Sequence, residues 1–153
     1  MDPDVKKSDM SKSKETLEIQ RESQITKEIK GIDSKIITNQ HVELISKWID
    51  GIDTNDELKT LYKFKLLHRG CDGFTSKKFR EICNNQTRTV TVVRVKDSNE
   101  ILGGYNPIAW ERSDYFNPRF GDTKESFIFS FKNKENIENH ILSRVKYNQS
   151  CKF

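Results

Sequence analysis

The sequence has few of the features that mark membrane-spanning or secreted proteins. Apolar residues make up only 33% of the 153 residues. No apolar run approaches the roughly 18 residues that a membrane-spanning helix needs. Residues 1–14, MDPDVKKSDMSKSK, have no apolar stretch after their charges, which argues against a secretory signal peptide. We therefore expect a cytoplasmic protein that does not insert into membranes.

Cysteine is also scarce, with Cys71, Cys83 and Cys151 widely spaced and no C-x-x-C pair. An odd number of cysteines without such a motif argues against a disulfide framework and fits a reducing compartment. Neither basic nor acidic residues are clustered along the sequence. The 27 basic and 23 acidic residues leave a net charge of +4, and the longest basic clusters are pairs such as Lys77-Lys78. We therefore expect no nucleic-acid partner, because such proteins gather their basic residues on one face or arm.

The chain divides into a polar start and a more structured remainder. Residues 1–33 are polar and poor in aromatic residues, and they are predicted to be a disordered tail because they cannot bury enough surface to offset the entropy of ordering. Residues 34–153 are predicted to form one domain.

Hydrophobic periodicity predicts the elements of this domain. Residues 38–50 show helical spacing and end at Gly51, and residues 75–85 show a second amphipathic pattern. Strands are predicted at 61–69, 87–96, 101–110 and 126–131, whereas residues 137–148 remain ambiguous. Consecutive strands with short connections favour antiparallel pairing, so the predicted class is α+β.

Two glycines and two tryptophans stand out within these elements. Gly103 and Gly104 lie inside a predicted strand, where they indicate a bulge or a close backbone approach. Pro107 lacks an amide donor and should end the pairing of that strand. Trp48 and Trp110 are expected to be core anchors.

Several segments, taken in order, resemble the TLDc domain family. They are SKII at 34–37, FKLLHRGCDGFTSKKFREIC at 64–83, TVTVVRVKDSNEILGGYNPIAW at 89–110 and ESFIFSF at 125–131. The resemblance extends over roughly residues 34–147. No single segment would suffice, but their order and spacing together make the resemblance specific.

The resemblance implies an antiparallel β-sandwich flanked by helices. Because family members continue beyond the F-x-F strand, we expect this sandwich to be incomplete at the carboxyl end. The family-motif positions are expected to be structural; they are Asp72, Gly73, Phe74, Gly103, Gly104 and Trp110.

The resemblance also implies a function. It points to an oxidation-resistance type of protein-interaction domain that protects against oxidative stress, with subunits of the vacuolar proton-pumping ATPase as partners. The alternative is a fragment related to the BTB-TLDc adaptors of ubiquitin ligases.

No residue pattern in the sequence predicts an enzyme. His68, Cys71 and Cys83 match no common zinc spacing, so no metal and no cofactor are expected. Cys71 beside His68 is the single pair that suggests a nucleophile or a redox-sensitive thiol. A turn cysteine next to basic residues explains the same pattern without chemistry, and we therefore assign no catalytic residue.

Overall fold

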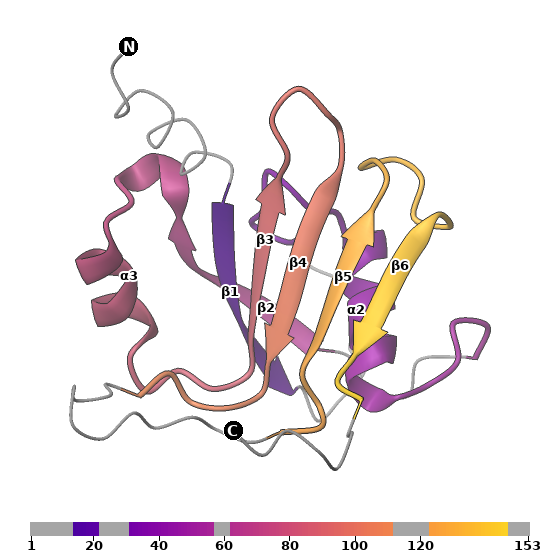
Figure 1. The fold of residues 1–153 in the computed structure, drawn as a ribbon, viewed down its shortest axis with the longest axis horizontal. Helices are drawn as coiled ribbons and strands as arrows, with labels where there is room; N and C mark the ends of the chain where they lie inside the picture. Colours follow the sequence, from indigo (N-terminus) through magenta and orange to yellow (C-terminus); the bar gives the residue numbers. More distant parts are fainter. Residues whose placement is uncertain (1–13, 22–30, 57–61, 112–122, 147–153) are drawn as a thin grey trace.

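The computed structural model of the chain describes residues 14–21, 31–56, 62–111 and 123–146. These residues form a single antiparallel sheet of six strands with the spatial order β2-β1-β3-β4-β5-β6 (Figure 1). The strands are β1 (Lys14–Arg21), β2 (Tyr62–Arg69), β3 (Thr89–Arg94), β4 (Ile101–Asn106), β5 (Phe127–Phe131) and β6 (His140–Arg144). Helix α2 (Asn39–Asp50), helix α3 (Ser76–Cys83) and the short 3-10 turn η1 (Gly70–Asp72) complete the described elements.

The predicted α+β class is confirmed, and most predicted elements appear close to their expected bounds. Strand β4 ends at Asn106, immediately before Pro107, as the missing amide donor requires. The ambiguous segment at 137–148 contains strand β6. The described strands lie in one sheet, and the second sheet of the implied sandwich is not among them.

The prediction of a disordered tail does not hold for residues 14–21, because they form strand β1 in the interior of the sheet. Leu17 and Ile19 alternate with polar residues and are buried, at 0% and 3% exposure. The average composition of residues 1–33, which is polar, hid this short alternation. The strand is stabilised by hydrogen bonding to β2 on one side and β3 on the other. Of the other residues of the predicted tail, 1–13 and 22–30 lie outside the described residues, and 31–33 precede α2.

Helix α2 covers one face of the sheet and is anchored by Trp48. The helix begins after Thr38 and ends at Gly51, which has the left-handed φ of 67° that favours glycine. The Trp48 ring packs against three phenylalanines of β5, with ring centroids 5.5–6.1 Å apart. These are Phe127, Phe129 and Phe131, the inward positions of that strand. Figure 1 shows α2 behind the strands, on the far side of the sheet.

A buried carboxylate joins β1 to its surroundings. Glu15 is 1% exposed and accepts hydrogen bonds from the Ser34 hydroxyl, from the Lys35 amide (3.0 Å) and from Arg69 Nε (3.1 Å). Arg69 Nη2 also donates to the carboxylate of Asp33 at 2.8 Å. This second carboxylate is solvent-exposed. The network therefore links β1, β2 and the segment that leads into α2.

Gly103 makes room for an aromatic ring of the core. A Cβ atom at this position would lie 2.2 Å from Cζ of Phe129, which is the facing residue on β5. The phenyl ring therefore lies directly against the glycine backbone. The predicted close backbone approach is confirmed at Gly103, and the β3–β4 and β4–β5 registers run without a bulge.

Removing the Glu15 charge should destabilise the domain strongly. In Glu15→Gln the Arg69 guanidinium loses its buried partner, and breaking a buried ion pair costs about 3–5 kcal/mol. The control Asp33→Asn removes the exposed partner of the same arginine and should cost at most about 1 kcal/mol. Urea unfolding followed by circular dichroism measures both values. Equal losses for the two variants would contradict the role given to Glu15.

The two adjacent glycines should respond differently to alanine. Gly103→Ala forces the Phe129 ring to move, and such overpacking costs about 1–3 kcal/mol. Gly104→Ala is the matched control, because its Cβ would lie 3.6 Å from Cγ2 of Ile128, an ordinary contact. Thermal melting should therefore show a lower Tm for Gly103→Ala and little change for Gly104→Ala. The reverse order would show that the ring is not held against Gly103.

Candidate functional site

The candidate site is the face of the sheet opposite α2, over strands β3 to β6. Side chains alternate between the two faces of a strand, so the pairing register identifies the residues that point away from α2. We call this surface the open face. Its strand positions are Thr89, Thr91, Val93, Leu102, Gly104, Asn106, Ile128, Ser130, Ile141 and Ser143.

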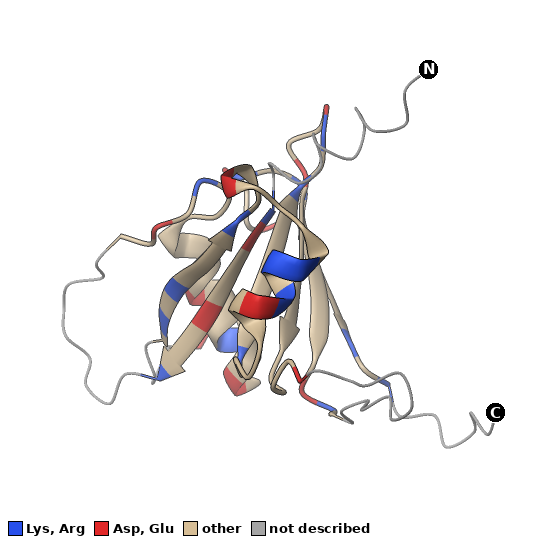
Figure 2. Ribbon diagram, turned by 90° about the vertical axis from the view of Figure 1, so that its left-hand side faces the viewer, with Lys and Arg blue, Asp and Glu red and all other residues tan. Residues whose placement is uncertain are grey.

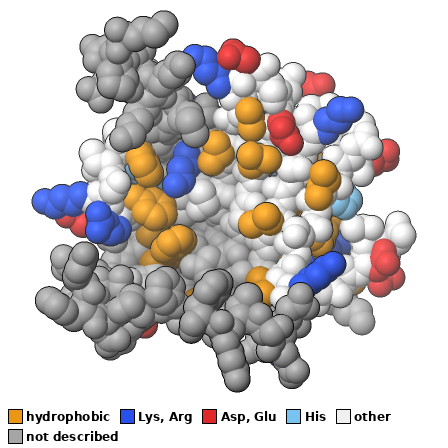
Figure 3. Space-filling view, viewed as in Figure 1, with side chains coloured by type: hydrophobic (Ala, Val, Ile, Leu, Met, Phe, Trp, Pro, Cys, Tyr) orange, Lys and Arg blue, Asp and Glu red, His pale blue; other side chains and the backbone are white. Residues whose placement is uncertain are grey.

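Large hydrophobic side chains are exposed on this face. Ile128 and Ile141 are 65% and 70% exposed, and Leu102 lies on the same surface at 43%. Val145 and Trp110, which border the face, complete the set of exposed large hydrophobic residues in the described ranges. In Figure 3 hydrophobic side chains surround a hollow on this side of the molecule. An apolar surface gathered on one face is typical of a contact site.

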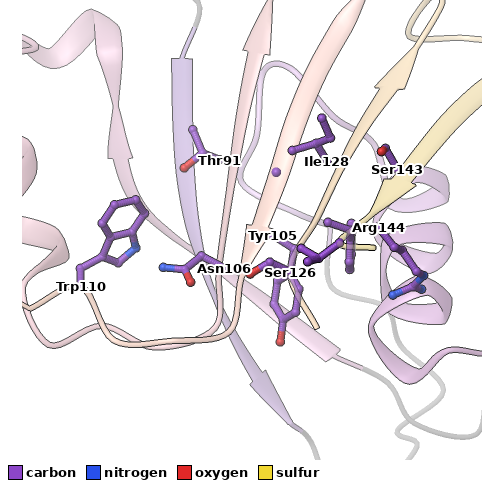
Figure 4. Close-up of a pocket in the computed structure, with 11 residues that line it drawn as sticks. Thr91, Tyr105, Asn106, Trp110, Ser126, Ile128, Ser143 and Arg144 are labelled. Carbon is purple, nitrogen blue, oxygen red and sulfur yellow. The ribbon is translucent and has the colours of Figure 1, made fainter. Parts of the chain in front are cut away.

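A cavity of about 470 Å³ lies on the open face. Trp110 borders it on one side, and Ile128 and Ser143 border it on the other, as Figure 4 shows. Gly104 contributes to the floor, where the absence of a side chain leaves space beside Thr91. The cavity is therefore a shallow, mostly apolar hollow with hydroxyl groups along its strands.

The ten strand positions of the open face include no charged residue. Arg144 borders the cavity, but its guanidinium donates to the backbone oxygen of Trp48 and lies over the Phe127 ring at 5.1 Å. By contrast, the side of the molecule that carries α3 and β2 bears both basic and acidic residues (Figure 2). In a chain with 33% charged residues, this distribution sets the open face apart.

An aromatic group under α3 forms the other boundary of the open face. Phe79 contacts Phe74 on one side and Trp110 on the other, with ring centroids 6.0 Å and 5.5 Å apart. Lys14 Nζ lies 4.8 Å and 4.6 Å from the Phe74 and Phe79 centroids, which is cation–π geometry. Burial lowers the pKa of Lys14. The Trp110 indole is fixed in turn by its N–H, which donates to the Thr89 hydroxyl at 2.8 Å.

The structure places the motif residues in three different roles. Asp72 and Gly73 belong to the turn before α3, where Gly73 has a φ of 90° and the Asp72 backbone oxygen accepts from Lys78. Phe74 joins the aromatic group under α3. Trp110 is 38% exposed, so the expectation that it anchors the core is wrong, whereas Trp48 is a core residue. Gly103 faces the core and Gly104 faces the cavity.

Sequence reasoning missed the hydrophobic residues of the open face. Ile128 lies between the inward phenylalanines of β5, so strict alternation already indicated that it points outward. Ile141 and Val145 lie in the segment whose structure was ambiguous, and no signal assigned them to a face. That Ile128, Ile141 and Gly104 share one surface depends on strand order, which short-range patterns do not specify.

Comparison with known proteins identifies the family. A family model of the TLDc domain matches residues 31–152, which is most of the chain. The chain belongs to the TLDc domain family. The match includes every described element from α2 to β6, whereas β1 precedes the matched residues. The comparisons with curated proteins and with solved structures gave no match.

Neither a metal centre nor a membrane-spanning helix is found in the described part of this TLDc domain. No group of three or more His, Cys, Asp or Glu residues within it is arranged to hold a metal ion. No helix in the same ranges is long and apolar enough to cross a membrane.

Cys71 and His68, the pair considered for nucleophilic chemistry, occupy different environments. The Cys71 thiol is exposed and donates to the Asp72 carboxylate at 3.5 Å. His68 is 4% exposed, and its ring lies 5.9 Å from that of Phe74. Burial, with a smaller contribution from Lys78, lowers the pKa of His68. A buried neutral imidazole next to an aromatic ring fits a packing role.

His41 is a buried titratable group on the α2 side of the sheet. It is 0% exposed, its ring meets Phe131 edge-on at 4.4 Å, and its Nδ1 accepts from the Thr38 backbone N–H at 3.2 Å. Nε2 has no hydrogen-bond partner within the described residues. Burial, followed by the nearby charge of Lys134, lowers the pKa of His41 to about 4. The folded domain therefore holds this histidine neutral.

The stability of the TLDc domain should fall as the pH drops from about 6.5 to about 4. In this window the unfolded chain binds a proton at His41 that the folded chain does not, so protonation favours unfolding by up to about 3 kcal/mol. Urea unfolding at a series of pH values measures the slope of the free energy of unfolding against pH. His41→Gln keeps an acceptor for the Thr38 amide but cannot titrate. The slope should be smaller in this variant, and an unchanged slope would contradict the assignment.

Proposed function

We propose that this chain is a non-enzymatic protein-interaction domain of the TLDc type. The observation that carries the proposal is the open face, with its exposed Ile128 and Ile141 and no charged residue among its strand positions. The cores of protein interfaces are depleted of charged residues. A soluble domain that leaves such a surface uncovered gains free energy when another protein covers it.

We infer further that the domain acts in the cytoplasm in protection against oxidative stress. This part of the proposal is supported by the resemblance to the oxidation-resistance type of TLDc domain. The partners that the resemblance implies are subunits of the vacuolar proton-pumping ATPase. The open face is the surface that we assign to that contact, because apolar area contributes most to association where it is fully buried.

The proposed mechanism is binding, without a covalent step on this chain. The exposed Cys71 is the thiol on which a redox alternative would depend. Its neighbour His68 is buried against Phe74 and has a lowered pKa, so it is poorly placed to activate that thiol. Cys71→Ala should therefore leave protection unchanged, and loss of protection in this variant would favour the redox alternative.

A charge placed on the open face should abolish partner binding. Ile128→Glu introduces a carboxylate that would be desolvated in the contact, and we expect at least about a tenfold loss of affinity, equivalent to about 1.4 kcal/mol. Gln40→Glu is the matched control, since it adds the same charge at an exposed position of α2. Affinity capture from oxidant-treated cells, quantified for ATPase subunits, measures the change. Survival of deletion cells that express each variant gives the functional result.

The outcomes separate the proposal from its alternative. Equal capture by Ile128→Glu and Gln40→Glu would remove the open face from the mechanism. If cells that lack this chain survive oxidant treatment normally, the proposed protective role is wrong. Recovery of ubiquitin-ligase subunits in place of ATPase subunits would favour the adaptor alternative.

A further inference from the structure

We propose that the open face binds a second copy of this chain, so that two sheets pack face to face. The inference rests on the proposed function, because it assigns a second copy to the surface that the proposed function already assigns to a protein contact. Three properties of the face carry it: the absence of charge, the alternation of large and small residues across the strands, and the size of the surface.

The charge distribution allows the face to contact itself. In a two-fold symmetric dimer each surface meets an identical surface, so every charge on it would meet or lie near a like charge. The strand positions of the open face carry none. Lys14 and Glu18 of β1 lie beside Val93 and Thr89 at the border of the face, and further charged residues lie on the side of α3 and β2 (Figure 2). A second copy that covers the strand positions of β3 to β6 therefore buries no charged residue of those strands against a like charge.

Large and small residues alternate across the strands in two adjacent rows. In one row Gly104, Ile128 and Ser143 face one another on β4, β5 and β6. In the next row the order is inverted. There, the large Leu102 and Ile141 flank the small Ser130. Across β4, β5 and β6 each large side chain therefore has small neighbours on the adjacent strands, whereas Leu102 faces Val93 on β3.

This alternation suits interdigitation with a copy of itself. Packed sheets lie about 10 Å apart, and their facing side chains interdigitate. A two-fold axis that lies between the two sheets, parallel to the face and between the two rows, places projecting residues of one copy over recessed positions of the other. Ile128 and Ile141 are the most exposed of the large hydrophobic residues in the described ranges, and the cavity beside Gly104 is a recess on the same face. Projection and recess lie on the same face, as self-complementarity requires.

The size of the face predicts a weak dimer. Four strands about 4.8 Å apart and some five residues long at about 3.4 Å each give a flat area of roughly 300–350 Å² per copy. Both copies together would then bury less than the about 1,200 Å² at which stable complexes begin. We therefore expect a concentration-dependent dimer with a Kd of roughly 10–100 µM.

Sedimentation velocity of the full 153-residue chain, from about 1 µM to several hundred micromolar, tests the inference. The sedimentation coefficient of the unmodified chain and of Gln40→Glu should rise from monomer towards dimer over this range. Ile128→Glu should remain monomeric. Both substituted positions, Gln40 and Ile128, are exposed, and circular dichroism verifies that each variant is folded.

A composition-preserving exchange tests the alternation itself. Ile128→Ser combined with Ser130→Ile leaves the apolar content unchanged but puts three large residues in one row, Leu102 and Ile141 being the other two. Dimerisation should weaken by about tenfold, because the projections no longer meet recesses. Equal dimerisation by the exchanged and unmodified chains would overturn the inference, since the contact would then be non-specific apolar adhesion.

A monomer at every concentration would also overturn it, and a second measurement would then identify the reason. A monomer that binds a hydrophobic dye has an uncovered face, whereas a monomer that does not bind dye has the face covered by its own chain. If Ile128→Glu nevertheless lost capture of a cellular partner, the proposed function would stand while self-association failed.

Discussion

The sheet depends on the hydrogen bonding of β1 along both of its edges. Strand β2 and strand β3 pair with β1 and not with each other, so the β2 edge is joined to the rest of the sheet through this one strand. Glu15 strengthens the connection, because its buried carboxylate binds Arg69 of β2 and the amide of Lys35. These interactions determine where α3 lies, since the turn before α3 follows directly from β2. They therefore also position the aromatic group that borders the open face.

The two faces of the sheet have different chemistry, and this difference gives the domain its proposed function. On one face, α2 buries the phenylalanines of β5 beneath Trp48. On the other face, α3 reaches only the β1–β2 end, and isoleucines of β5 and β6 stay exposed. Solvated faces of antiparallel sheets usually carry polar residues. An uncharged face with exposed isoleucines departs from that pattern and is better suited to contact with protein than with water.

The elements with strong local signals could be predicted from the sequence, and those that depend on distant partners could not. Helix α2 has helical spacing and a glycine stop, and β5 alternates strictly, so both were predicted near their observed bounds. Strand β1 was missed because its apolar residues are only Leu17 and Ile19, within a polar region, and because it gains its stability from β2 and β3. The open face was missed for a related reason: Gly104 and Ile128 become neighbours only when β4 pairs with β5. Local patterns indicate which side of a strand is buried, but they do not specify what covers the other side.

The glycine pair in β4 makes the sheet unusually thin at one point. Gly103 has no side chain towards the core and Gly104 has none towards the cavity, so a single layer of backbone separates the two regions. The Phe129 ring lies against one side of that layer, and Trp48 packs behind the ring at 5.5 Å. Only the glycine backbone of β4 and the Phe129 ring therefore lie between the cavity and the Trp48 indole. Trp48 fluorescence is thus placed to report events on the opposite side of the molecule.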